Sequence, residues 1–520
     1  MHLVFATRED PQLPLARLRS QNQLTELRAA DLRFTSSEAT EFLNQVMGLD
    51  LSAEDIAALE NRTEGWIAGL QLAAISLQGK EDTTNLIKSF SGSHRLVLDY
   101  LIEEVLEQQS ESVQTFLLQT AILERLNGSL CDALTGQDNG QATLEMLEHA
   151  NLFFVPLDEE RRWYRYHHLF GDLLRERLKQ TQPKKLPILH SLASKWFEQQ
   201  GLIDEAIEHA LQSDNFDQAA RMIDEHIEER WQRGKLARLW RWLDKLPDEM
   251  VYNNPNLCIF LAWNLFINGN QEKAEESLQA AEKKFDLLTE TLLEKQPEEH
   301  EHPSRLMEKK VRGRAAAIRA VMAIYRSDAD GSMKSARLAL ELLPGDDLNW
   351  RSAAATALAD AYVFMGEYDR AHQARFESLK ISKTAGNTYL YLIDSTKCVL
   401  VLKARGELQQ AREFCQQQIL FAKDKGFSKT GTIGWMQAIL GEILAETNDM
   451  DGAYEMVRVG VNLTERGRDV ALLSWSYMCL TRVLHSLGDQ AGAEKIINKT
   501  KVMAQETTTP PWVNNQIINW

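Results

Sequence analysis

Gly366-Glu367-Tyr368-Asp369-Arg370-Ala371 joins a turn-forming glycine to an alanine five positions later, and the chain repeats this arrangement along its second part. Four copies begin at residues 366, 406, 448 and 488, a period of about 40 residues that is typical of a helical solenoid. The full set of pairs is Gly201/Ala206, Asp214/Ala219, Gly269/Ala274, Gly331/Ala336, Gly366/Ala371, Gly406/Ala411, Asn448/Ala453 and Gly488/Ala493.

The repeated residues have a structural explanation. Glycine or asparagine at the turn can take the left-handed conformation that ends a helix, and a small alanine lets two helices approach closely. We therefore predict that the repeat alanines are packed between helices. Because a solenoid binds its partners along an extended surface, more than half of the chain is expected to serve recognition, not chemistry.

The composition favours a globular protein. Hydrophobic residues make up 44% of the 520 residues and charged residues 26%. The formal net charge of −17 opposes phosphate binding, which needs clustered lysine and arginine. Five scattered cysteines without a C-x-x-C pair indicate reduced thiols in a cytoplasmic protein with no zinc site. No apolar run reaches the ~18 residues that span a membrane.

Both ends of the sequence suggest a longer parent chain. Residues 3–6 have the pattern of a short buried strand, but no strand-like segment follows until about residue 152 to pair with them. Residues 512–520 begin an amphipathic helix that stops before a helical hairpin could close. We therefore expect this chain to be the middle of a longer protein.

Short helices are expected after the first 30 residues. Ser36 or Ser37 is predicted to cap a helix that reaches Met47. Ser52 with Asp55 is predicted to start a second helix. Further helices are expected over residues 64–77, 86–90 and 96–108.

A hairpin between helices gives the middle of the chain a winged-helix pattern. Residues 151–157 and 163–166 are strand-like, and Asp158-Glu159-Glu160-Arg161 between them is suited to a turn. Everything after Pro187 is expected to be helical. The helix that follows the hairpin has one apolar face, made of Leu169, Phe170, Leu173, Leu174 and Leu178.

Two features of the repeat region have alternative explanations. Residues 282–311 are predicted to contain an insertion, which is either a solvated loop or helix extension, or a regulatory docking segment. Five aromatic residues either line the concave face of the solenoid or fill the core between helices: Tyr362, Tyr389, Tyr391, Trp435 and Trp475.

Five segments are distinctive in their order and spacing: residues 3–19, 31–34, 64–72, 100–106 and 163–170. Together they resemble the MalT-like, large LuxR-type transcriptional regulators, which belong to the signal-transduction ATPases with numerous domains. The resemblance continues through the helical repeats and therefore covers nearly the whole chain.

The resemblance implies a mainly α protein in four parts. Residues 1–30 would be the C-terminal remnant of a P-loop ATPase module, and residues 31–108 a helical domain. Residues 109–185 would form a winged-helix domain. Residues 186–520 would form a TPR-like α-solenoid superhelix that senses the signal.

This chain departs from the family pattern at both ends. It has no G-x-x-x-x-G-K-[ST], no Walker B acid and no C-terminal helix-turn-helix. We therefore expect no enzymatic activity, no catalytic residue and no ATP or ADP bound by this chain alone, although the intact protein would bind both nucleotides. DNA would be contacted only through a C-terminal domain that this sequence lacks.

Three candidate nucleotide contacts of the intact protein lie in the first 70 residues. Arg8 follows the predicted strand, where ligands of α/β sheets lie, and by resemblance it matches the family's sensor arginine. The alternative is a surface arginine. Gly65 and Gly69 flank Trp66 and resemble the G-x-P motif that touches the nucleotide base in related ATPases. Close helix packing is the alternative for both glycines.

The fourth candidate, His167, follows the second predicted strand and precedes His168. By resemblance the pair takes the place of a Met-His-Asp motif, in which the histidine senses the β-phosphate of bound ADP. A packed histidine at a strand–helix junction is the alternative. Two adjacent histidines without a third ligand do not make a metal site.

The sequence and the resemblance together predict the inducer-sensing and regulatory portion of an ATP-dependent transcription activator. An inducer small molecule or a regulatory protein would bind the superhelix and control nucleotide-dependent self-association, and no membrane partner is expected. The alternative is a free-standing TPR-like adaptor for protein–protein interaction, in which substitution of His167 would change nothing. A hydrolase of nucleoside triphosphates would need the missing Walker motifs.

Overall fold

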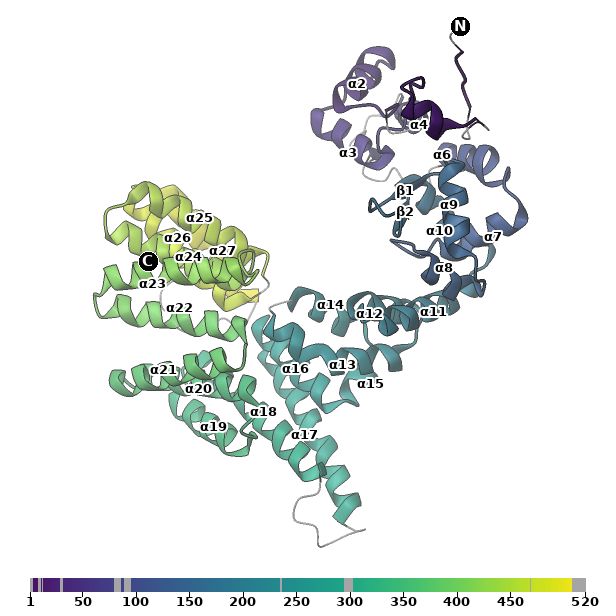
Figure 1. Cartoon of the computed structure of the whole chain (residues 1–520). Coiled ribbons are helices and arrows are strands. Elements are labelled where there is room, and N and C mark those ends of the chain that lie inside the picture. Colours follow the sequence, from purple (N-terminus) through teal and green to yellow (C-terminus); the bar gives the residue numbers. More distant parts are fainter. Residues whose placement is uncertain are drawn as a thin grey trace. The chain divides into compact units, whose positions relative to one another are not determined.

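Figure 1 shows a computed structural model of the chain, which describes residues 3–7, 11, 13–28, 31–78, 86–87, 95–233, 236–293, 303–467 and 469–506. The chain folds as two compact units, Met1–Asn215 and Phe216–Trp520. Helices dominate both units, which confirms the prediction of a mainly α protein. None of the described helices is both long enough and apolar enough to cross a lipid bilayer.

The first unit begins with short helices. Those before the hairpin are α1 (Leu15–Ser20), α2 (Ser36–Thr40), the π-helix η1 (Glu41–Val46), α3 (Ala53–Thr63), α4 (Ile67–Leu77), α6 (Arg95–Leu101), the π-helix η2 (Ile102–Leu106), α7 (Glu111–Thr120), α8 (Gly128–Thr135) and α9 (Gly140–His149).

Helix caps explain where two of these helices begin. The side chain of Ser52 accepts a hydrogen bond from the Asp55 amide, as predicted for the start of α3. The cap of α2 is Thr35, so the prediction of Ser36 or Ser37 is wrong by one or two residues. Thr35 has extended backbone angles and completes a reciprocal capping box with Glu38, which neither serine can form.

Residues 3–6 form no strand in this structure, and a strand paired with an upstream sheet stays a prediction. Residues 3–7 have no regular secondary structure and pair with no described strand, and Val4 is 95% exposed. Apolar residues form a strand only where a neighbouring strand can take their backbone hydrogen bonds, and the described part of the chain offers none there. The expected helices at residues 88–90 and 512–520 lie outside the described residues.

The predicted wing is confirmed. Strands β1 (Phe154–Pro156) and β2 (Tyr164–Tyr166) pair in antiparallel register, and an isolated bridge joins Leu126 to Tyr164. The Asp158 carboxylate accepts the amides of Arg162 and Trp163 at 2.8 and 3.0 Å, which closes the turn. Helix α10 (His168–Thr181) then buries the five predicted apolar residues.

Two buried histidines join the last helices of this unit, α11 (Lys185–Gln199) and α12 (Ile203–Gln212). The Nδ1 atoms of His190 and His209 lie 2.8 Å apart, so one ring donates a hydrogen bond and the other accepts it. Burial lowers the pKa of His190 to about 4. Burial, together with the neighbouring His190, lowers the pKa of His209 to about 3.

We expect the first unit to lose stability as the pH falls below 6.5. The unfolded chain takes up protons on both histidines near pH 6.5, whereas the folded chain resists protonation until about pH 4 and 3. The slope is up to about 1.4 kcal/mol per pH unit for each histidine. Thermal unfolding between pH 7 and 4 measures it. The double variant His190→Leu/His209→Leu should flatten the slope, whereas replacing the exposed His149 should not.

The second unit is built entirely of helices in its described part. They are α13 (Phe216–Gln232), α14 (Leu236–Lys245), α15 (Asp248–Tyr252), α16 (Pro255–Ile267), α17 (Gln271–Leu293), α18 (Pro303–Tyr325), α19 (Ala329–Leu342), α20 (Leu348–Phe364), α21 (Tyr368–Thr384), α22 (Thr388–Ala404), α23 (Leu408–Asp424), α24 (Gly431–Glu446), α25 (Met450–Glu465), α26 (Val470–Ser486) and α27 (Gln490–Glu506).

The repeat pattern has the predicted structural meaning. From α16 onwards, helices pack in successive antiparallel pairs (Figure 1), and all eight repeat alanines are at most 2% exposed. Seven of the eight turn residues have the left-handed backbone conformation. Gly331 is the exception: it lies in the first turn of α19 and donates its amide to the Asp328 cap, and Ser327 takes the left-handed position instead.

The insertion at residues 282–311 consists, where it is described, of helix extensions. Helix α17 continues to Leu293 and α18 begins at Pro303. Arg319 of α18 holds the two helices together through Glu275 and Glu282 of α17.

Two of the five aromatic residues, Tyr389 and Trp435, are buried. The rings of Trp435 (α24) and Trp475 (α26) lie 6.0 Å apart. These contacts favour the core explanation for Tyr389 and Trp435. Tyr391 touches Phe421 of α23, and Tyr362 lies 6.0 Å from the Arg370 guanidinium.

Candidate functional site

Four of the distinctive sequence segments meet at one place in the first unit. Trp66, just before α4, is the centre of the cluster. Its ring centroid lies 5.7 Å from that of Tyr100, 5.1 Å from that of Phe153 and 6.1 Å from that of His167. Phe34 adds a backbone contact, because its amide donates to the carbonyl of Gly65. We call this meeting point the Glu64 junction. It consists of Phe34, Glu64, Gly65, Trp66, Tyr100, Phe153 and His167.

Glu64 links the end of α3 to the wing. It has a left-handed backbone conformation, and its carboxylate accepts two hydrogen bonds from Arg165 at 2.7 and 2.9 Å. The His168 amide donates to the same carboxylate at 3.1 Å, and Arg33 approaches it to 3.7 Å. Burial by itself would raise the pKa of Glu64, but the hydrogen bonds from Arg165 and His168 and the adjacent positive charges lower it to about 2.

His167 is buried beside this ion pair. Its side chain is 4% exposed, and Nε2 lies 2.9 Å from the carbonyl oxygen of Thr63, so Nε2 carries the proton in this contact. Nδ1 is buried and has no hydrogen-bond partner among the described residues. Burial lowers the pKa of His167, although the charge of Glu64 acts in the opposite direction.

Atoms of the chain itself fill the space beside both candidate glycines. Gly65 has a φ of +71°, and a Cβ there would lie 2.6 Å from the Phe34 carbonyl oxygen. A Cβ on Gly69 would lie 2.7 Å from the Trp66 ring and 3.2 Å from Thr63. These contacts support the close-packing alternative for both glycines, and contact with a nucleotide base stays a prediction.

We expect Gly65→Ala to destabilise the first unit more than Gly136→Ala. Both glycines have a φ of +71°, but nothing lies within 4 Å of a Cβ on Gly136. The strain of a positive φ, about 1 kcal/mol, is therefore common to both variants. The clash with Phe34 should add at least about 1 kcal/mol for Gly65. Equal losses in chemical denaturation would show that the Phe34 contact adjusts freely.

The structure brings together three of the four predicted site residues. Gly65, Gly69 and His167 all lie around Trp66 and Thr63. Arg8 lies outside the described residues. The role of the four in nucleotide binding stays a prediction.

Glu64 and Arg165 are two further members of the site that were not predicted from the sequence. Both lie inside distinctive segments, and Arg165 is a charged residue between two tyrosines of a short strand. A charge at a half-buried strand position needs a partner, which was the signal available. The sequence could not indicate which residue is that partner, because 101 residues separate Glu64 from Arg165.

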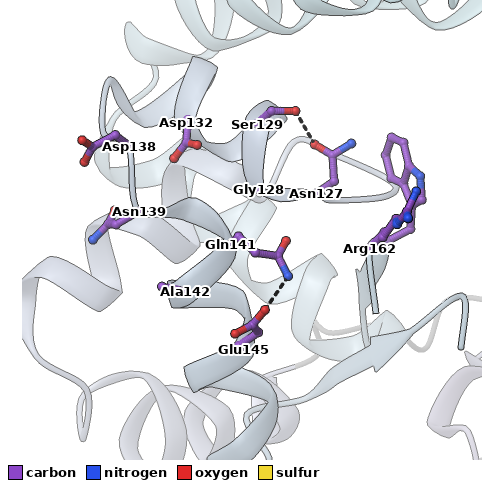
Figure 2. A pocket seen from close by; sticks show the side chains of 11 residues that line it. Asn127, Gly128, Ser129, Asp132, Asp138, Asn139, Gln141, Ala142, Glu145 and Arg162 are labelled. Atoms are coloured by element: carbon purple, nitrogen blue, oxygen red, sulfur yellow. Dashed lines mark hydrogen bonds between the residues drawn. The ribbon is translucent and has the colours of Figure 1, made fainter. Parts of the chain in front are cut away.

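A separate pocket of about 610 Å³ lies on the winged-helix part (Figure 2). None of the junction residues lines it. Figure 2 shows Asp132 and Asp138 on one side and Arg162 on the other, and with Glu145 the acids outnumber the base. This balance disfavours phosphate groups there. The pocket is lined by Asn127, Gly128, Ser129, Asp132, Asp138, Asn139, Gln141, Ala142, Glu145, Arg162 and Trp163.

Two stretches of the chain match known domain families. Residues 102–186 match the MalT winged helix domain, and residues 313–519 match the MalT-like TPR region. The first stretch includes the wing and α10, and the second includes the repeat pairs from α19 onwards.

Several known proteins are similar to this chain. The HTH-type transcriptional regulator MalT of Vibrio parahaemolyticus is 26% identical over 99% of this chain and 55% of its own length. The serine/threonine-protein kinase PknK of Mycobacterium tuberculosis is 35% identical over 51% of this chain and 24% of its own length. The crystal structure of a STAND protein with a tetratricopeptide repeat sensor from Pyrococcus horikoshii matches 94% of this chain and 74% of that one, at 16% identity and a TM-score of 0.41.

A MalT-type winged helix followed by a MalT-like TPR superhelix defines the class of this protein as a winged-helix protein with helical repeats. The chain belongs to the MalT-like family by its winged-helix and TPR domains. It spans about half the length of the MalT relatives that it matches.

Proposed function

We propose that this chain is the inducer-sensing and regulatory portion of an ATP-dependent transcription activator. The observation that carries the proposal is the meeting of four family segments at the Glu64 junction, in a chain of the MalT-like family. A free-standing adaptor has no need for such a junction beside its repeats.

In this proposal residues 1–30 are the C-terminal remnant of the nucleotide-binding module, residues 31–108 form a helical domain and residues 109–185 form the winged-helix domain. The superhelix of residues 186–520 binds an inducer molecule or a regulatory protein. Its ligand must bind the open, self-associating state more tightly than the closed state, because a ligand with equal affinity for both shifts nothing. DNA is contacted by another part of the intact protein.

His167 is the residue that would hold ADP in the closed state. While Nε2–H donates to Thr63, Nδ1 is the ring atom left for a ligand. A phosphate oxygen only accepts hydrogen bonds, so Nδ1 must take up a proton to bind it. The negative phosphate would itself favour that proton against the effect of burial.

The test compares His167→Ala with His149→Ala, an exposed histidine, in the longer protein that includes the nucleotide-binding module. Loss of the phosphate contact should weaken ADP binding by about tenfold or more and raise the self-associated fraction. The control should behave as the parent. ADP affinity and assembly that are unchanged in His167→Ala would favour the adaptor alternative.

A second experiment concerns the chain by itself. Because the 520 residues contain no P-loop motif, titration calorimetry with ATP and with ADP should detect no micromolar binding. Micromolar affinity for either nucleotide would contradict the idea that the P-loop is required.

A further inference from the structure

Helix α13, the first helix of the second unit, contacts helices far along the chain. Asn256 of α16 donates to Asp224 of α13 at 2.7 Å, and Arg314 of α18 donates to Glu228 of α13. Asn349 of α20 lies 3.5 Å from the same Glu228 carboxylate, 121 residues away in sequence. Asp224 and Glu228 of α13 thus contact α16, α18 and α20, which are the first helices of three successive repeat pairs.

Arg314 stands at the centre of this contact chain. Its side chain is 3% exposed, and its Nε and Nη1 atoms donate to Asp347 at 2.9 Å and to Asn256 at 2.7 Å. With Glu228, the guanidinium therefore joins α13, α16, α18 and the residue that precedes α20. Removing a partner from a buried guanidinium strongly destabilises the fold around it. The contacts of Arg314 therefore hold these four elements together.

The contacts continue to α22, which is the first helix of the next repeat pair. Asn387 caps α22, and its Nδ2 donates to Asn349 at 3.1 Å. Both side chains are at least nine-tenths buried. Helix α13 also contacts α22 itself.

An aromatic cluster packs against the same end of α13, about one turn beyond Glu228. Trp231 is fully buried, and its ring centroid lies 5.6 Å from that of Phe260 and 5.8 Å from that of Trp263, both on α16. The ring of Trp350 on α20 lies 4.7 Å away. The polar and the apolar contacts of α13 therefore bind the same set of helices.

This arrangement departs from an ordinary solenoid, in which each repeat contacts only its neighbours and small rotations add up along the chain. We propose that α13 is a strut that fixes the angles between the pairs from α16 to α22 and moves when those angles change. Residues 213–215 join α13 directly to α12 of the first unit. The strut is therefore the element through which a ligand on the superhelix would act on the rest of the chain.

The biological meaning of the strut rests on the proposed function, but its mechanics are tested without nucleotide or inducer. Glu228→Gln removes the charge that faces Arg314 with little change in shape. Backbone hydrogen exchange in α13 and in the first turns of α16, α20 and α22 should become about tenfold faster or more. Glu225→Gln is the control on the same helix, since Glu225 is half exposed and pairs with Arg221. Faster exchange confined to α13 would overturn the strut.

Transmission is tested from the far end of the contact chain. Asn387→Ala at the N-cap of α22 should speed exchange in α13 and at residues 213–215, whereas Asn462→Ala on the exposed side of α25 should not. Unchanged exchange at residues 213–215 would overturn transmission through α13. That failure is distinct from a failure of the proposed function, which is measured by the nucleotide response of His167 variants.

Discussion

Arg165→Ala should lower the free energy of unfolding of the first unit by about 3 kcal/mol. The Glu64 carboxylate is 9% exposed and the Arg165 side chain 26% exposed, so the pair is shielded from water. Removing the guanidinium leaves a buried carboxylate that has lost two hydrogen bonds and most of its compensating charge. Chemical denaturation of the full chain, monitored by hydrogen exchange in α3 and α10, measures the loss of unfolding free energy.

The matched control is Arg162→Ala on the same wing. Arg162 is 75% exposed and pairs with the exposed Glu160, so its loss should change stability by less than about 0.5 kcal/mol. Equal effects of the two substitutions would show that the Glu64–Arg165 pair adds nothing specific to stability.

The same pair gives a pH signature. Because the folded pKa of Glu64 is lowered to about 2 from its usual 4.5, its contribution is complete above pH 4.5 and is lost as the pH falls towards 2. Arg165→Ala should therefore lose less stability on acidification over this window than the parent. Parallel pH profiles for the two proteins would contradict the assignment.

Arg375→Met should destabilise the repeats around α21 by about 3–5 kcal/mol. Arg375 is almost fully buried between Asp360 of α20 and Asp394 of α22. Burial raises the pKa of Asp394, while burial of Asp360 is outweighed by the charges of Arg375 and Lys397, which keep its pKa low. Without Arg375, the charge of Asp394 is compensated by hydrogen bonds from Thr356 and Ser378 and by the charge of Lys397, which pairs with Asp360.

Two variants make this prediction specific. Arg370→Met on the same helix removes a 67% exposed arginine and should change stability by less than about 0.5 kcal/mol. Adding Asp394→Asn to Arg375→Met should recover part of the loss, because a neutral amide needs no buried cation. A double variant as unstable as Arg375→Met would show that packing, not charge, accounts for the effect. Guanidinium denaturation and hydrogen exchange in α20–α22 provide the measurements.

The sequence was most informative where the physical cause is local. The turn at Asp158, the cap at Ser52 and the buried repeat alanines each depend on a few neighbouring residues, and all three were predicted. Two predictions of local features were wrong by a few residues, because neighbouring residues decided between alternative caps and turns. Thr35 caps α2 because Glu38 lies three residues later, and Ser327 takes the left-handed turn that was assigned to Gly331.

For the candidate site, the sequence located the segments but not the contacts between them. His167, Gly65 and Gly69 were chosen from a family resemblance, and the structure places them around one tryptophan. Glu64 and Arg165 were missed as a pair because the strand position of Arg165 indicates that it needs a partner but not which residue, 101 positions away, supplies it. Their pairing becomes visible only when α3 and the wing are in place.

The sequence by itself determined the mainly α class, the position of the wing and the period of the repeats, because caps, turns and helix periodicity act within a few residues. Only the tertiary structure decided that Glu64 pairs with Arg165, that Glu228 reaches Arg314 and Asn349, and that residues 3–6 form no strand. These outcomes depend on which distant segments become neighbours, since a buried charge or an open strand edge is stable only when another part of the chain supplies its partner.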